Sequence, residues 1–244
     1  MNYHLTLEFL GTNYSGWLYQ PNHPSVQGTL QKILEKLLKR KIVLTGCSRT
    51  DSGVHACNFH AHFAMKNMPV PLDNFARAMN SLLPQDIVIK NIEEVNEDFH
   101  PVTSAQEKTY CYTILNRPLP SVFDSETSTH VTFTLNDKAI YEAASYLEGE
   151  HNFRSFCTDP ETKKHHVRCI KSITVRRDKD FLLIHVTGNG FLYNMVRIIV
   201  GTLIEVGRGR IGPEIIPDIL ASRDRDHAGP TAAPQGLCLV DVIY

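Results

Sequence analysis

The chain has 244 residues, of which 42% are hydrophobic, and its formal net charge is −1 at pH 7. This length suits one large domain or two modest ones, and this apolar fraction can fill a sizeable core. The sequence contains no run of eighteen apolar residues and does not begin with a basic segment followed by an apolar block. We therefore expect neither a membrane-spanning helix nor a secretory signal.

The six cysteines are scattered and include no Cys-x-x-Cys pair. This distribution argues against a disulfide scaffold and a structural zinc site, and it favours a reducing, cytoplasmic location. The near-neutral charge excludes a polyanion-binding surface over the whole molecule but allows a local basic cleft. Two clusters could line such a cleft, although solvated surface charge explains either one equally well. They are Lys36, Lys39, Arg40 and Lys41, and Lys163, Lys164, His165, His166 and Arg168.

Residues 1–100 are predicted to contain a strand, a helix, two strands, a helix and a strand, which is the order of a ferredoxin-like unit. The predicted elements are an alternating strand through Leu5, Leu7 and Phe9, a helix capped by Ser25, strands at 42–44 and 58–63, a helix capped by Asp73, and a strand at 87–89. A turn-prone segment at 98–101 ends this N-terminal half.

Residues 101–244 are predicted to repeat this order of elements as a C-terminal half. The predicted elements are a strand at 109–115, a helix capped by Asn136 or Asp137, a hairpin of 173–175 and 181–186, a helix at 191–206 with Gly207 as its C-cap, a short helix opened by Pro213, and a strand at 237–242. We therefore predict an α+β fold of two ferredoxin-like halves, whose mixed and mainly antiparallel sheet is flanked by helices.

A turn at 46–56 carries the most chemically suggestive residues. Arg49, Thr50 and Asp51 follow one another between the two predicted strands, and Gly46 and Gly53 permit sharp turns. A loop of this composition held between strands is a usual place for a reactive side chain. Asp-Ser-Gly taken by itself is much more typical of an ordinary turn than of a reactive site.

Arg197 is the one charged residue in the otherwise apolar segment 191–204. A helix that is apolar nearly all round is buried, and an unpaired buried guanidinium is costly. We therefore expect an acidic partner for Arg197, or a side chain that reaches a wet cleft or bulk solvent.

Two further groups of residues could be either structural or functional. Tyr110 and Tyr112 lie on one face of their strand, where tyrosines are ordinarily core or sheet residues. His60 and His62, with His55 upstream, could bind a metal, but the sequence offers no obvious acidic or cysteine partner.

The turn at 46–56 resembles the G-x-G-R-T-D-A-G-V-H-A signature of the TruA family of tRNA pseudouridine synthases. Serine replaces the second glycine at Ser48 and the alanine at Ser52. Residues 191–201 resemble the F-L-x-x-M-V-R-x-I-V-G segment of the same family. Tyr110 matches the first tyrosine of R-x-Y-x-Y, in which Lys108 replaces the arginine, and Val102 stands where a further arginine is expected. The resemblance covers essentially the whole chain.

The resemblance implies isomerisation of uridine to pseudouridine in the tRNA anticodon stem-loop, at positions 38 to 40. It implies a homodimer with a central cleft and no metal or other cofactor. In the family, the aspartate corresponding to Asp51 is catalytic and pairs with the arginine corresponding to Arg197, while the tyrosine corresponding to Tyr110 packs beside the target base. We assign Tyr110, Arg49, Lys108 and His55 to substrate binding.

Two other functions are possible on the sequence alone. One is a ferredoxin-like RNA-binding protein without catalysis, and the other is a metalloenzyme that uses His55, His60 and His62. Neither requires Asp51, Tyr110 and Arg197 together.

Overall fold

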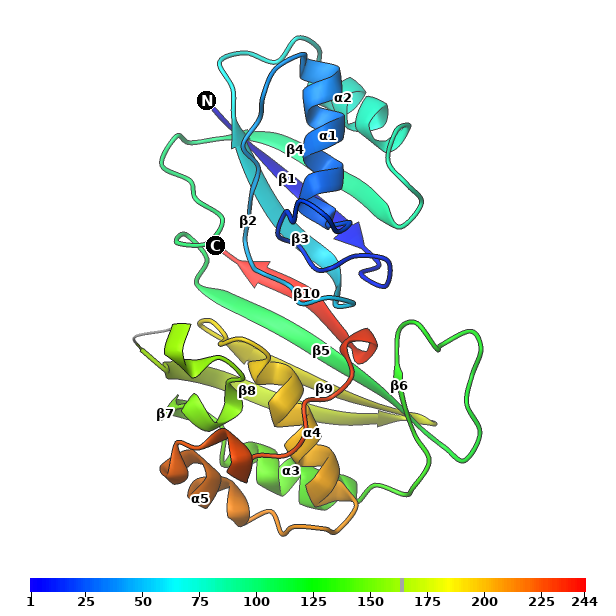
Figure 1. Ribbon diagram of the computed structural model, residues 1–244, viewed down its shortest axis with the longest axis vertical. Coiled ribbons are helices and arrows are strands. Elements are labelled where there is room, and N and C mark those ends of the chain that lie inside the picture. Colours follow the sequence, from blue (N-terminus) through cyan, green and yellow to red (C-terminus); the bar gives the residue numbers. More distant parts are fainter. Residues whose placement is uncertain (163–164) are drawn as a thin grey trace. The chain divides into compact units, whose positions relative to one another are not determined.

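The computed structural model in Figure 1 describes residues 1–162 and 165–244. Lys163 and Lys164, which belong to one of the predicted basic clusters, lie outside the described residues. Contacts within the chain define two compact units, Met1–Gln106 with Cys238–Tyr244 as unit 1, and Glu107–Leu237 as unit 2. The sequence also predicts two functional halves that meet near residue 100, one with Asp51 and one with Tyr110 and Arg197. This functional division stays a prediction.

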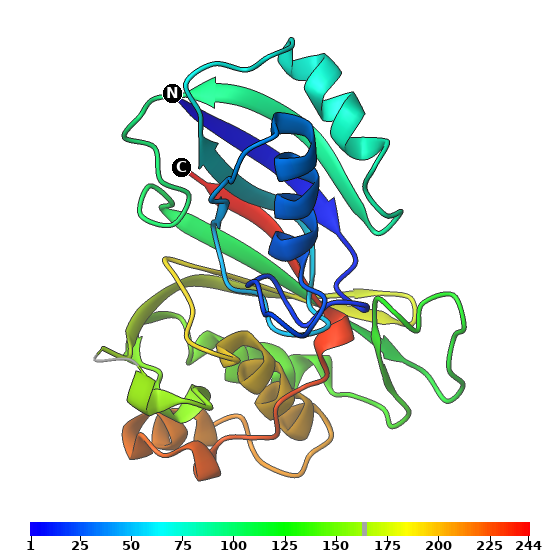
Figure 2. The same cartoon turned by 45° about the horizontal axis from the view of Figure 1, so that its top comes forward.

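Unit 1 contains a ferredoxin-like sheet. Its strands are β1 (Asn2–Phe9), β2 (Thr45–Gly46), β3 (His55–Ala64), β4 (Ile87–Val95) and β10 (Leu237–Ile243), and its helices are α1 (Val26–Leu38) and α2 (Leu72–Asn80). The order β4-β1-β3-β2 is antiparallel throughout, as the predicted βαββαβ order requires. Strand β10 joins β3 in parallel, and Figure 2 shows the two side by side.

Apolar side chains on the helix-facing side of this sheet form the core of unit 1. Leu5 and Leu7 of β1, Phe59 and Phe63 of β3, and Leu30 and Leu34 of α1 are fully buried. The Ser25 side chain accepts a hydrogen bond from the backbone of Gly28, so the predicted cap of α1 is confirmed.

Two predicted elements of unit 1 were wrong. Residues 42–44 are not a strand, because pairing with β3 is limited to Thr45 and Gly46. Asp73 lies in the first turn of α2 and is not its cap. The cap position is Pro71, which has no side-chain donor or acceptor. Here Asp73 contributes only charge near the helix N-terminus.

Strand β3 contains a bulge that the sequence did not reveal. Leu7 pairs with Phe59 and Phe9 pairs with Ala56, so β3 has one residue more than β1 over this stretch. Between these two pairs, Cys57 and Asn58 of β3 lie opposite the single residue Glu8 of β1. A bulge of this kind redirects side chains.

Unit 2 contains mostly antiparallel strands together with helices. Its strands are β5 (Glu107–Asn116), β6 (Thr129–Val131), β7 (Gly149–Asn152), β8 (Val167–Asp178) and β9 (Phe181–Gly188), and its α-helices are α3 (Asp137–Ser145), α4 (Met195–Gly207) and α5 (Ile215–Ser222). The order β5-β9-β8-β7 is antiparallel, and β6 pairs with β5 in parallel. The segment β5-β9-β8 has the same relative order as β1-β3-β2, which agrees with the predicted repeat.

The predicted termini in unit 2 are partly corrected. Asn136 is the cap of α3 and accepts hydrogen bonds from Lys138 and Ala139. Helix α4 begins at Met195 instead of residue 191, because Asn194 adopts a left-handed conformation with φ 59°. Gly207 is the last residue of α4 and not its C-cap, which is Arg208. A Cβ on Gly207 would lie 2.6 Å from Ile140, so this glycine permits close packing of α3 on α4.

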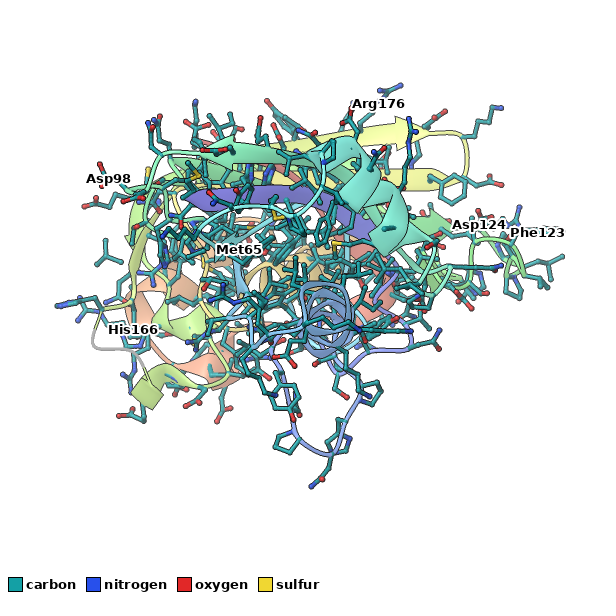
Figure 3. The ribbon with its side chains drawn as sticks, turned by 90° about the horizontal axis from the view of Figure 1, so that it is seen from above. Met65, Asp98, Phe123, Asp124, His166 and Arg176 are labelled. Atoms are coloured by element: carbon teal, nitrogen blue, oxygen red, sulfur yellow. The ribbon has the colours of Figure 1, made fainter. Side chains whose placement is uncertain are left out.

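The loop between β5 and β6 carries strongly exposed apolar side chains. Val122 is 89% exposed and Phe123 is 97% exposed. Figure 3 shows Phe123 and Asp124 on this loop at the edge of the molecule. The Arg117 guanidinium donates hydrogen bonds to two carbonyl oxygens of the loop, at Leu119 and Pro120. The Arg117 side chain therefore holds the loop backbone in place, while the apolar side chains of the loop face solvent.

Buried His60 should make unit 1 sensitive to acid. His4 and His60 stack and share a hydrogen bond of 2.8 Å between ring nitrogens, and His4 also contacts Glu93. Burial, and then the charge of His4, lower the pKa of His60 from 6.5 to about 4, against opposing effects of Asp241 and Glu93. The unfolded chain therefore takes up a proton below about pH 6.5 that the folded chain takes up only near pH 4.

The free energy of unfolding is thus expected to fall as the pH drops from about 6.5 to about 4, with His60 contributing up to about 3 kcal/mol of the loss. Urea titrations at several pH values on the wild type and His60→Gln measure this contribution. The variant should lose less stability over that interval. Equal losses in both proteins would show that His60 does not contribute.

Candidate active site

The turn at Asp51 is held by its own backbone and by a neighbouring loop. The Val54 N–H donates to the Asp51 carbonyl at 3.1 Å, and Gly53 lies between them at φ 78°. That positive φ is why a glycine is needed at the third position of this turn. Asp51 is half-buried, while Arg49 is exposed and Thr50 is buried.

The loop 11–17 supports the turn through backbone atoms. The Tyr14 carbonyl accepts hydrogen bonds from the Gly53 N–H and the Ser52 hydroxyl, and the Trp17 N–H donates to the Thr50 carbonyl. Gly16 approaches so closely that a Cβ there would lie 2.3 Å from the Thr50 carbonyl oxygen. One loop that is distant in sequence, 11–17, therefore fixes the backbone on both sides of Asp51.

Trp17 anchors the supporting loop in the core. It is 1% exposed, and its ring stacks on Phe59 with centroids 4.1 Å apart. A Cβ on Gly46 would lie 2.5 Å from the indole, so only glycine leaves room for it. Trp17 is therefore a core residue that anchors this loop.

Tyr14 is tied to the end of the sheet through Asp86. The Tyr14 hydroxyl donates to the Asp86 carboxylate at 2.6 Å, and Asn13 donates to the same side chain. Burial, and then this bond to Asp86, raise the pKa of Tyr14. The supporting loop is therefore fixed at both ends, by Tyr14 and by Trp17.

His55 is buried at the start of β3, and its Nδ1 accepts a hydrogen bond from the Gly11 N–H at 2.9 Å. This bond places the donor hydrogen of a neutral ring on Nε2. No group of three or more His, Cys, Asp or Glu among residues 1–162 and 165–244 is placed to hold a metal ion. The metalloenzyme interpretation therefore gains no support from the described histidines.

Arg197 lies in the first turn of α4 and is half-buried. Its Nε donates to the Ala232 carbonyl at 2.7 Å, and its Nη1 donates to the Asn194 side chain at 2.8 Å. Asn194 in turn donates to the Thr158 hydroxyl. The guanidinium is thus oriented by neighbours in unit 2 and is not simply extended into bulk water.

Gly201 brings the Ala232 carbonyl within reach of Arg197. A Cβ on Gly201 would lie 1.7 Å from the Pro230 carbonyl oxygen, so the segment 229–232 runs directly against α4. The Ala232 N–H also donates to the Arg197 carbonyl. This packing depends on a helix position without a side chain.

Gly201→Ala is therefore expected to destabilise the protein by about 2–4 kcal/mol, as overpacking against backbone does. Denaturant titration measures this loss. Gly190→Ala is the matched control, because a Cβ there meets its nearest neighbour, Arg168, at 3.9 Å. The idea of a required glycine fails if the two variants have equal stability.

Tyr110 and Tyr112 lie on the same face of β5, opposite Val186 and Ile184 of β9. Tyr110 is 6% exposed, and its ring meets Phe191 edge to face with centroids 5.3 Å apart. Tyr112 is fully buried, with its hydroxyl bonded to Thr129 and to the Ala233 carbonyl. The core interpretation of Tyr112 is correct.

Burial raises the pKa of Tyr112 to about 12, with the hydrogen bond to Thr129 and the charge of Arg197 opposing this rise. The Tyr112 hydroxyl and the Arg197 Nε donate to the adjacent carbonyls of Ala233 and Ala232, which brings the guanidinium close to this tyrosine. Phe191 and Arg197 thus approach the two tyrosines from one segment. Lys108 is a half-buried residue of the same strand.

The structure groups the predicted site residues into two sets. Arg49, Asp51 and His55 belong to the turn of unit 1, whereas Lys108, Tyr110 and Arg197 belong to unit 2. Sequence reasoning missed the residues that position them. Tyr14, Phe191 and Asn194 have no catalytic chemistry of their own, and only their places within the family-like segments marked them.

The comparisons with known proteins agree on one family. The model of a family described as tRNA pseudouridine synthase matches residues 6–102 and 143–244. A protein of Ruminiclostridium cellulolyticum, "tRNA pseudouridine synthase A", is 48% identical over 98% of both chains. A protein of Clostridium perfringens, "tRNA pseudouridine synthase A 2", is 44% identical over 100% of this chain and 99% of its own.

Among solved structures, the chain is similar to one described as "Crystal structure of the archaeal box H/ACA sRNP Nop10-Cbf5 complex", with a TM-score of 0.36 and 15% identity. That match covers 95% of this chain and 61% of the other. No helix among the described residues is long and apolar enough to cross a membrane. On the family model and the full-length relatives, this chain belongs to the tRNA pseudouridine synthase family.

Proposed function

We propose that this chain, an isomerase of the tRNA pseudouridine synthase family, converts uridine to pseudouridine in the anticodon stem-loop of tRNA, at positions 38 to 40. Its relatives carry the name tRNA pseudouridine synthase A over their full length. The comparisons give no support to a non-catalytic RNA-binding protein. The reaction cleaves the bond between C1′ and N1, turns the uracil, and joins C1′ to C5. The C5 proton leaves and N1 gains one, so the reaction needs no redox partner.

Asp51 is the proposed catalytic carboxylate. An ionised carboxylate can act on the glycosidic carbon or on the base, and both routes use a fixed, oriented group. The double support of its turn by the loop 11–17 fits this demand, because catalysis depends on holding the reacting groups in place. This support is the observation that carries the proposal.

As the family resemblance implies, Arg197 is proposed to supply the cation that keeps the Asp51 carboxylate ionised. Its guanidinium is already oriented by Ala232 and Asn194. Tyr110, held edge to face by Phe191, is proposed to pack against the uracil and to assist removal of the C5 proton.

Arg49, Lys108 and His55 are proposed to help bind the tRNA. Base chemistry requires the nucleotide to leave the stack, and the exposed Arg49, two residues before Asp51, would fill the vacated space. Lys108 would contact phosphate as a point charge. His55 would act mainly by holding Gly11 and the supporting loop.

Release of tritium from tRNA labelled at uracil C5 tests this function. The protein should release tritium from tRNA carrying uridine at positions 38 to 40, and little from the same tRNA with cytidine there. Release from tRNA without those uridines would show that the enzyme modifies other positions. No release from any tRNA would contradict the proposed isomerase activity and favour a protein that only binds RNA.

The chain is further proposed to act as a cytoplasmic homodimer whose tRNA contacts both subunits. Sedimentation at micromolar concentration, with and without tRNA, measures the assembly. A stable monomer that retains full activity would contradict the dimer.

A further inference from the structure

Tyr19 is an exposed aromatic residue just beyond the loop that supports the reactive turn. Its side chain is 61% exposed, and the neighbouring Leu18 is also exposed. Tyr14 and Trp17 of the supporting loop are buried, so this stretch of chain directs two aromatic rings into the core and one toward solvent. The chemistry proposed above does not use the outward ring.

The backbone of Tyr19 is held by the first turn of α1. The Tyr19 N–H donates to the Gln27 side-chain oxygen at 2.7 Å, and the Gln27 side-chain nitrogen donates to the Leu44 carbonyl. The Gln27 N–H donates to the Trp17 carbonyl at 3.0 Å. Gln27 therefore fixes the chain at both Trp17 and Tyr19, which leaves the exposed ring only its own side-chain torsions.

One edge of the Tyr19 ring rests on Gly28 of α1. A Cβ on Gly28 would lie 2.9 Å from Cδ2 of the ring, and equally close to the Ser25 hydroxyl oxygen. Glycine is unfavourable within a helix, because it loses more conformational freedom on folding than alanine does. At this position it leaves room for the ring, which is seated along one edge while most of its surface stays open to solvent.

Tyr19 lies beside the reactive turn within unit 1. The Trp17 N–H donates to the carbonyl of Thr50, the residue before Asp51. Two residues of chain span at most about 7 Å, so the backbone of Tyr19 lies within that distance of Trp17. A nucleotide extruded toward Asp51 would therefore leave its neighbours in the RNA strand close to this ring.

Exposed aromatic residues are common on protein surfaces and need no function. Tyr141 of α3 is an example, since it is 62% exposed on a helix of unit 2. Tyr19 differs because Gln27 holds its backbone and Gly28 receives its ring edge. A ligand that meets an ordered side chain loses less binding free energy to ordering it.

We propose that Tyr19 is a stacking platform for one unpaired base of the tRNA anticodon loop. The inference rests on the proposed function, which brings a nucleotide of this stem-loop to Asp51. Proteins recognise single-stranded RNA loops by stacking their bases on aromatic side chains. Such stacking tolerates any base, because every base has a π-face. Tyr19 thus adds affinity for the loop and takes no part in the chemical step.

Binding of the full-length protein to a synthetic anticodon stem-loop tests the proposal, with fluorescence anisotropy as the readout and one loop base at a time replaced by an abasic site. One position should weaken binding to the wild type by about tenfold. The same replacement should weaken binding to Tyr19→Ala by less than about twofold, because that variant has already lost the contact. Tyr19→Phe should behave as the wild type. The absence of such a position, or an equal loss in Tyr19→Ala, would overturn the proposal.

Tyr141→Ala is the matched control, because Tyr141 is as exposed as Tyr19. It should bind the intact stem-loop as the wild type does, whereas Tyr19→Ala should bind it about tenfold more weakly. In steady-state tritium release, Tyr19→Ala should raise KM about tenfold and change kcat less than about twofold. A lower kcat with unchanged KM would contradict the platform.

The binding measurements need no turnover, so they separate this inference from the proposed isomerase. Normal tritium release by Tyr19→Ala with unchanged affinity for the stem-loop would refute the platform alone. No tritium release by the wild type, together with binding that depends on Tyr19, would refute the isomerase and keep the platform.

Discussion

Asp51→Ala is expected to lower the rate of pseudouridine formation by about 10⁴-fold or more, the scale on which single catalytic groups act. The expected cause is loss of the carboxylate proposed to attack the nucleotide, from a turn whose backbone would remain held by Tyr14 and Trp17. Single-turnover tritium release with excess enzyme measures the chemical step. tRNA binding, measured by filter retention, should change by less than about threefold, because phosphate contacts dominate that affinity.

Asp51→Asn separates charge from shape at the same position, and it should be as inactive as the alanine variant. Asp73→Asn removes the same charge from an exposed site on α2 and should keep wild-type activity. Activity near the wild-type level in either Asp51 variant would refute the assignment of this residue.

Arg197→Met should give the second-largest loss, about 10²–10³-fold in the chemical step. The methionine keeps much of the side-chain length but removes the cation proposed to hold Asp51 ionised. It also leaves the Ala232 carbonyl and the Asn194 side chain without the donors that they now have. Arg197→Lys should recover only part of the rate, because an ammonium keeps the charge but lacks the planar fork. Single-turnover rates measure both variants.

A double-mutant cycle tests the pairing separately from the chemistry. The free energies of unfolding of Asp51→Asn, Arg197→Met and the double variant should reveal a coupling of at least about 1 kcal/mol. Arg208→Met, beyond the other end of α4, is the control for arginine loss, because Arg208 stacks over Phe133 and pairs with Glu205. Its rate should match the wild type. Zero coupling between the two site residues would contradict an ion pair.

The fold could be predicted from the sequence wherever one local signal decides the structure. Ser25 and Asn136 were recognised as caps because a short polar side chain before an apolar repeat satisfies free N–H groups. Asp73 carried the same signal but is not the cap, because α2 already begins at Leu72, after Pro71 in the cap position. The left-handed turn at Asn194 has no comparable pattern, because the apolar residues before it continue the helical periodicity.

The sequence could predict those site residues that lie in short segments of characteristic composition. The reactive turn was found from its small residues around Arg49 and Asp51. The residues that fix it could not be found in this way, because their contacts join distant parts of the chain. The fit of Gly201 against Pro230 and the contact of Tyr110 with Phe191 follow from packing, not from local periodicity.

The return of β10 to unit 1 has a consequence for the order in which a newly made chain can fold. The sheet of unit 1 gains β10 only after all of unit 2 has left the ribosome, because Cys238 and Leu239 pair with the start of β3. Tyr244 then packs against His4 and His60, and its hydroxyl donates to the Pro101 carbonyl. Until that moment the nascent domain has an unpaired strand edge beside its reactive turn, so translation itself delays completion of the site.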